Sequence, residues 1–158
     1  MIPRPEAKCK AIQGLGRLAT LRKGQRMGTG EGGRGKGKTS PLLEAHRIQA
    51  LAAKVGFDWP DAGGPLDKVR EELAEVERAT GNGQREAIED EIGDLLFAVV
   101  NLARKLGIDP DAALARAIEK FTRRFAEVER LAEARGISVG NASLKELDEL
   151  WEEVKRRH

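Results

Sequence analysis

Two groups of acidic side chains are spaced so that their members share one face of a helix. Glu72 and Glu75 are three residues apart, directly after Glu71. Glu91 and Asp94 repeat this spacing after an interval of fifteen residues. Residues three apart are neighbours on a helix surface, so two antiparallel helices would bring these carboxylates together, and their repulsion would then require a divalent cation. Ligation by carboxylate oxygens without His or Cys indicates Mg²⁺, with Mn²⁺ as the other possibility.

The alternative interpretation is that these acids form an ordinary solvated face. For the three acids of the first group this is the expectation, since charged pairs on helix surfaces are common. Glu91 and Asp94 lead directly into the apolar run LLFAVV, so we expect their helix to be buried, and buried acids are rarely left unpaired. Gly93 lies between them although a helix interior disfavours glycine by about 1 kcal/mol, which indicates close approach by a neighbour or a ligand.

Basic and aromatic side chains elsewhere could complete a pocket for a metal-bound phosphate. Lys120 and Arg124 are four residues apart, as are Trp151 and Lys155, and Lys68 lies one turn before the first acidic pair. Each cation alone is more typical of a solvated side chain, and a tryptophan in a terminal amphipathic helix usually belongs to the core. Together with the acids, the cations would bind phosphate oxygens, and Trp151 would offer its ring to a base.

The elements that must position these residues are all helices. Apolar residues recur at helical spacing in five segments, and no alternating segment competes with them. The expected helices cover approximately residues 41–55, 66–80, 88–106, 110–135 and 143–154. The Gly-Gly-Pro sequence at 63–65 is expected to be a loop. Short connections favour antiparallel packing, so we predict an all-α bundle of four to five helices. The third helix, which is apolar around most of its girth, should be central.

The start of the chain differs from the remainder in charge. Residues 1–40 hold ten Lys and Arg against two acids, whereas the remaining residues hold eighteen against twenty-four. A Gly-rich basic stretch has little apolar surface to bury, so we predict a flexible leader over 1–39 and a folded domain over 40–158. The leader sequence GGRGKGKT has the spacing of a phosphate-binding loop, but no strand precedes it, so a nucleotide loop is not expected there.

Composition excludes several classes of protein. One cysteine allows neither an intrachain disulfide nor a cysteine-based zinc cluster, and two distant histidines make a histidine metal site improbable. The longest apolar run has six residues, far below the roughly 18 of a membrane span, and no secretory signal is visible. A cytoplasmic location and no membrane partner are the expectations.

The segments that carry these residues resemble the MazG family of nucleoside triphosphate pyrophosphohydrolases, specifically the second of the two domain copies in longer members. The family motif is EExxE followed by ExxD, and it is met here in EELAE and EIGD. The likeness runs through HRIQALAAKVGFDWPD, KVREELAEV, EDEIGDLLFAVVNLARKLGIDP, EKFTRRFAEVE and LDELWEEVKR. Residues 1–39 match neither copy.

The resemblance implies a MazG-like helical bundle assembled as a homodimer or higher oligomer. It also implies Mg²⁺-dependent hydrolysis of NTP or dNTP to the monophosphate and pyrophosphate. By motif position the metal ligands would be Glu72, Glu75, Glu91 and Asp94. The triphosphate would be bound by Lys120 and Arg124, with Lys68, Trp151 and Lys155 as further candidates.

The expected mechanism is attack of a metal-activated water on the α-phosphorus. Glu71 or Glu75 would take the proton of the water, and the phosphate-binding cations would stabilise the leaving pyrophosphate. Two alternatives stay open. One is a related all-α hydrolase of narrower substrate, such as dUTP or phosphoribosyl-ATP. The other is a non-catalytic helical module whose basic leader binds nucleic acid; nucleic acid is otherwise only weakly suggested as a partner.

Overall fold

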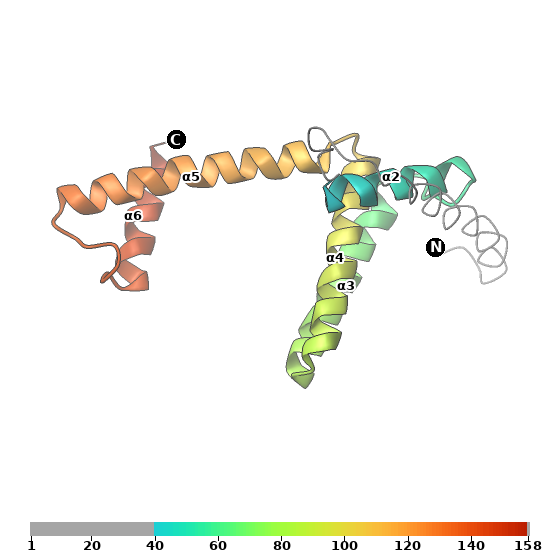
Figure 1. Cartoon of the computed structure of the whole chain (residues 1–158), viewed down its shortest axis with the longest axis horizontal. Helices are drawn as coiled ribbons and strands as arrows, with labels where there is room; N and C mark the ends of the chain where they lie inside the picture. The colour runs from blue at the N-terminus through green and yellow to red at the C-terminus, as the bar shows by residue number, and fades with distance from the viewer. Residues whose placement is uncertain (1–39, 158) are drawn as a thin grey trace, which may run out of the picture. The chain divides into compact units, whose positions relative to one another are not determined.

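A computed structural model describes residues 40–157, and these form an all-α structure, as predicted. No strand occurs in the described range. The helices are α2 (Pro41–Lys54), α3 (Gly63–Asn82), α4 (Arg85–Lys105), α5 (Pro110–Ala134) and α6 (Leu144–Arg156) (Figure 1). The predicted leader and its phosphate-loop pattern lie outside the described residues.

The helix starts follow from local capping chemistry. The side chain of Ser40 accepts a hydrogen bond from the backbone N–H of Leu42 at 3.2 Å, and Pro41 occupies the first turn of α2, where its missing N–H is not needed. Ser143 and Glu146 form a reciprocal capping box at the start of α6. Each cap satisfies backbone donors that the first turn of a helix leaves without a partner.

Helix α3 begins three residues earlier than the sequence pattern predicts, so the expected loop at 63–65 is wrong. The N–H of Gly63 donates to the side chain of Asp61 at 2.7 Å, so the first helical residue has a hydrogen-bond partner just before the helix. Pro65 falls within the first four positions, whose N–H groups have no partner inside the helix, so proline costs no hydrogen bond there. Gly64 is needed because a Cβ at this position would lie 1.9 Å from Cδ1 of Trp59.

The chain divides into two compact units at the Asp111–Ala112 boundary, near the start of α5. In the first unit, α3 and α4 lie side by side as an antiparallel hairpin, and α2 packs on α4 (Figure 1). Gly83 closes the hairpin with φ 69°, a left-handed conformation that glycine adopts without strain. Whether 40–158 acts as one domain stays a prediction.

Helix α4 packs against both α2 and α3, in agreement with the central place that its composition predicts, but it is not buried all round. Ala98, Val100 and Asn101 are its buried residues. Large apolar side chains on its other faces are 41–53% exposed in this chain: Ile92, Leu96, Phe97 and Val99. Neighbouring helices within the chain therefore cover only part of its apolar surface.

An ionic contact fixes the loop between α2 and α3 to the C-terminal end of α4. Asp58 accepts from Arg104 at 2.5 Å and from Lys105 at 3.2 Å, and Lys105 also donates to the carbonyl oxygen of Trp59 at 2.6 Å. The hydrogen bond from Arg104 lowers the pKa of Asp58, and the hydrogen bond from Lys105 lowers it further. Burial of the carboxyl acts in the opposite direction, but the net pKa is lowered. The loop that leads into α3 is thereby held on the α3–α4 hairpin.

The second unit has its own small core between the C-terminal half of α5 and α6. Val128, Ala132, Leu150 and Val154 are fully buried. An ion pair of 2.7 Å between Arg135 and Glu153 borders this core. By contrast, the first half of α5 exposes Leu114, Ile118 and Phe121. Among the described residues, none of the helices combines the length and apolar character needed to cross a membrane.

Candidate functional site

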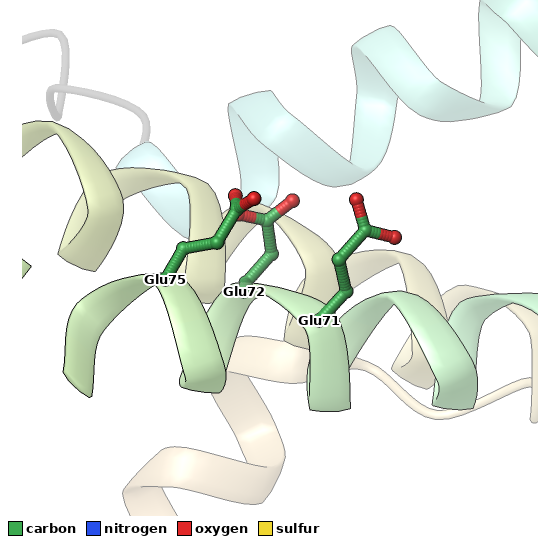
Figure 2. A group of neighbouring side chains, drawn as sticks. All are labelled: Glu71, Glu72 and Glu75. Carbon is green, nitrogen blue, oxygen red and sulfur yellow. The ribbon is translucent and has the colours of Figure 1, made fainter. Parts of the chain in front are cut away.

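The acidic residues of α3 converge on one side of that helix. Figure 2 shows Glu71, Glu72 and Glu75 projecting in the same direction from α3. Each of them places one carboxylate oxygen within 4.8 Å of the oxygens of the other two. The spacing of three and four residues produces this arrangement, because such residues are stacked on one helix face.

Helix α4 adds its own acids to the same place. Glu91 and Asp94 each place a carboxylate oxygen within 4.8 Å of Glu72 and of one another. The short Gly83–Gln84 connection makes α3 and α4 antiparallel, and this pairing aligns the two motifs. Glu72 is common to both groups of three, so it is the centre of what we call the acidic cluster: Glu71, Glu72, Glu75, Glu91 and Asp94.

The burial of these acids is the reverse of the expected order. Glu72 was expected on a solvated face, yet its side chain is only 4% exposed, whereas Asp94 is exposed and Glu91 is half-buried. The buried residues of α3 are Pro65, Glu72 and Ala79, which are seven residues apart. A seven-residue row forms the contact seam between neighbouring helices, and Glu72 occupies the middle position of that row.

The acidic cluster holds more negative charge than its neighbouring cations balance. Lys68 forms ion pairs with Glu71, at 2.8 Å, and with Glu72, but the second carboxylate oxygen of Glu72 is buried without a hydrogen-bond partner. Desolvation acts to lower the pKa of Lys68, and its hydrogen bonds to these two carboxylates raise it above the usual range. Arg78 pairs with Glu75 at 3.0 Å from an exposed position.

Repulsion within the cluster is also evident at Glu91. Desolvation raises the pKa of Glu91, and the charges of Glu75, Glu72 and Asp94 raise it further, against a smaller opposing effect of Arg78. The negative charge of these carboxylates exceeds the positive charge near them, and one buried oxygen has no hydrogen-bond partner. A hard divalent cation fits such a group, because it prefers carboxylate oxygens as ligands and reduces their repulsion. The donor set therefore fits the predicted cation in chemical type.

Gly93 is not explained by packing within this chain. A Cβ at this position would meet no atom within 4 Å among the described residues. The close approach by a neighbour that the sequence predicts at Gly93 is therefore absent from the described chain.

The other predicted binding residues belong to the second unit. Lys120 is exposed on α5, and Arg124, one turn later, is half-buried with its Nε atom buried and lacking a hydrogen-bond partner. Trp151 packs against Phe121 with ring centroids 5.3 Å apart, and its half-buried ring borders the α5–α6 core. Lys155 pairs with Glu152 at 2.6 Å.

Sequence reasoning missed one buried polar residue, Gln49, where α2 contacts α4. Its side chain is buried against α4, where its amide donates a hydrogen bond to the backbone of Phe97. The signal was present, because Gln49 lies in the otherwise apolar row formed by Leu42, Ala45 and Ala52. A polar residue in such a row is buried more often than its type suggests, and a buried polar group needs a partner.

Comparison with known proteins agrees with these observations. Residues 66–128 match the model of the MazG nucleotide pyrophosphohydrolase domain, a span that contains the whole acidic cluster. The nucleoside triphosphate pyrophosphohydrolase of Escherichia coli K12 is 48% identical over 118 residues, which cover 73% of this chain and 45% of that protein. The nucleoside triphosphate pyrophosphohydrolase/pyrophosphatase MazG of Thermotoga maritima is 44% identical over 123 residues, which cover 75% of this chain and 47% of that protein.

The matches cover only part of each related protein. The chain spans slightly less than half the length of these two relatives. A shorter match, 45% identical over 65 residues, links 41% of the chain to 13% of the protein YabN of Bacillus subtilis. Residues 66–128 therefore belong to the MazG nucleotide pyrophosphohydrolase domain family, as the acidic motifs predicted.

Proposed function

We propose that this chain hydrolyses nucleoside triphosphates to the monophosphate and pyrophosphate in a reaction that depends on Mg²⁺ or Mn²⁺. The observation that carries the proposal is the convergence of Glu72, Glu91 and Asp94 on one place, with a buried oxygen of Glu72 lacking a partner. The matched relatives from E. coli and T. maritima carry the same activity in their names. Residues 40–158 are the proposed catalytic domain, and residues 1–39 are a proposed basic leader.

The proposed metal ligands are Glu72, Glu75, Glu91 and Asp94. A bound Mg²⁺ supplies positive charge that polarises the α-phosphate and acidifies a water molecule. The carboxylates orient the triphosphate by holding that charge between α3 and α4. By holding a cation, these carboxylates would also lessen the mutual repulsion that, after desolvation, contributes to the raised pKa of Glu91.

The proton of the attacking water must be accepted by a carboxylate oxygen that does not itself bind the metal. Glu71 and Glu75 are the candidates, since both belong to the acidic cluster and neither is fully buried. Glu71 is bonded to Lys68, and Glu75 is bonded to Arg78. A carboxylate oxygen of one of these residues takes the proton as the water attacks the α-phosphorus.

The leaving pyrophosphate requires positive charge, and we assign this role to Lys120 and Arg124. The buried, unpartnered Nε atom of Arg124 retains a hydrogen-bond donor for an oxygen ligand. We propose Lys68, Trp151 and Lys155 as further substrate-binding residues. Hydrogen bonds to the phosphate oxygens would strengthen as charge develops in the transition state.

We also propose that the chain acts as a homodimer or higher homo-oligomer in the cytoplasm, where nucleoside triphosphates are present. Two exposed apolar surfaces support self-association: the outer faces of α4 and the first half of α5. Apolar surfaces of this kind commonly mark protein contacts. Light scattering of the purified chain measures the assembly directly, and a monomer at micromolar concentration would contradict the proposal.

The reaction is tested by incubating the full chain with each NTP and dNTP and Mg²⁺ and identifying the products. Monophosphate with pyrophosphate is expected, and diphosphate with orthophosphate would refute the reaction class. Glu91→Gln and Asp94→Asn should each abolish pyrophosphate release while helical circular dichroism is retained. Glu89→Gln is the matched control, because Glu89 lies on α4 but pairs with Arg85 outside the cluster. Full activity in either cluster variant would contradict the assigned site.

A further inference from the structure

The structure contains a buried hydrogen-bond acceptor where α2 contacts α4, the helix that carries Glu91 and Asp94, and the proposed chemistry does not use it. Within α2, all of which is described, Gln49 is the single buried residue, with 6% of its surface exposed. The large apolar residues of that helix are all half-buried: Leu42, Leu43, Ile48 and Leu51. A leucine or methionine would fill this position without a polar group, so packing alone does not account for an amide.

The hydrogen bonding of Gln49 fixes the orientation of its amide. Its Nε2 atom donates to the backbone carbonyl oxygen of Phe97 at 2.8 Å. The reverse orientation would place two oxygens against each other, so the nitrogen must face Phe97. The remaining atom, Oε1, is buried and has no hydrogen-bond partner. A buried acceptor in this state lowers stability unless a ligand or a water supplies an N–H or O–H donor.

The position of this acceptor relates it to the acidic cluster. Phe97 follows Asp94 by three residues, which is a rise of about 4.5 Å along α4. One turn farther along, Asn101 is also buried, and its spacing of seven residues from Asp94 places it on the same face. On this face the carboxylates of α4 are thus followed by the amide of Asn101, whose oxygen accepts from Arg104 at 2.9 Å, while α2 contributes the amide of Gln49. This order matches a ligand with phosphates at one end and a neutral heterocycle at the other.

From this juxtaposition we propose that Gln49 is a specificity residue that accepts a hydrogen bond from an N–H group on the edge of the nucleobase. The inference rests on the proposed function, because it places the phosphates at the acidic cluster. Its ligand class is a base with a donor on its hydrogen-bonding edge. A structural water on Oε1 is the competing explanation, and the experiment separates the two.

The experiment compares nucleotides that differ in a single donor, using the full chain with Mg²⁺. The pairs are ATP with purine riboside triphosphate, CTP with pyrimidin-2-one riboside triphosphate, and UTP with its N3-methyl derivative. In at least one pair the wild type should show a kcat/KM about tenfold higher for the donor-bearing nucleotide, the usual effect of one hydrogen bond to a buried group. In Gln49→Met this ratio should fall to about one, because only the donor-bearing substrate loses an interaction.

Controls separate specificity from packing. Leu51→Met changes the packing of the same helix without altering an amide, so it should preserve the wild-type ratio. An equal loss of kcat/KM for both members of every pair in Gln49→Met would overturn the inference and leave the hydrolase intact. Equal turnover of both members of all three pairs by the wild type would also overturn it, and this result does not depend on whether Gln49→Met folds. A wild type that hydrolyses no nucleotide would refute the proposed function together with the inference.

Discussion

Lys68 is the cation that contacts the most buried acid of the cluster, so its removal tests the charge balance on which the metal site depends. The side chain of Glu72 is 4% exposed and one of its oxygens already lacks a partner. In Lys68→Met the other oxygen would lose its ion pair as well. Breaking a fully buried pair costs about 3–5 kcal/mol. Because the Lys68 side chain is 39% exposed, solvent screens part of the effect, and we expect a loss of about 2 kcal/mol.

The measurement is the free energy of unfolding from urea titrations, made once with EDTA and once with Mg²⁺. In EDTA, Lys68→Met should be less stable than the wild type by about 2 kcal/mol. In Mg²⁺ most of this difference should disappear, because the cation stabilises the native state when it binds there and replaces the missing positive charge. The matched control is Arg70→Met on the same helix, which removes an exposed pair with Asp67. We expect it to change stability by less than about 0.5 kcal/mol in both conditions.

Two results would refute this reasoning. If Lys68→Met cost no more than Arg70→Met in EDTA, the ion pair between Lys68 and the buried Glu72 would not contribute to stability. If the loss in EDTA were unchanged in Mg²⁺, the cation would bind elsewhere or not at all. Circular dichroism of the folded variants confirms that both contain the same helices before unfolding is measured.

Three further predictions concern residues that position the site. Gly64→Ala should lower the free energy of unfolding by about 1–3 kcal/mol, because its Cβ would overlap Trp59 at 1.9 Å; Gly81→Ala in the same helix meets no atom within 4 Å and should raise it by about 0.5–1 kcal/mol. Gly93→Ala should raise the thermal midpoint in EDTA, since its Cβ also meets nothing within 4 Å, and a lower midpoint would contradict the described surroundings. The pKa of Asp58 in the folded chain is lowered from 3.8. The charged carboxylate therefore contributes to stability above that pH, and this contribution is lost as the pH falls through the pKa of the folded state. The difference in unfolding free energy between wild type and Asp58→Asn should accordingly shrink in acid titrations below pH 3.8.

The helices could be predicted because their signals are local. Ser40 with Pro41, and Ser143 with Glu146, are capping sequences that act within one turn, and the structure confirms both starts. The start of α3 could not be predicted from the Gly-Gly-Pro sequence. It depends on the side chain of Asp61 accepting from the N–H of Gly63, which requires a loop conformation that no local pattern specifies.

The convergence of the acids was predictable, and their burial was not. Spacings of three residues place Glu72 beside Glu75, and Glu91 beside Asp94, whichever way the helix is turned. Burial depends on the rotation of α3 about its own axis, which is set by contacts with α4. The buried row of Pro65, Glu72 and Ala79 shows how α3 is rotated. This row could not be predicted from the sequence, because a contact row is recognised by its apolar residues and this one has an acid at its centre.

The composition of that row links stability to the proposed chemistry. In the buried row of α3 the positions on either side of Glu72 are a proline and an alanine. Small side chains bury little apolar area, so these two positions contribute little to the stability of the hairpin. A cation bound by Glu72 would therefore stabilise the hairpin at a buried position that holds a carboxylate in place of an apolar side chain, and for this reason the unfolding of Lys68→Met should depend on Mg²⁺.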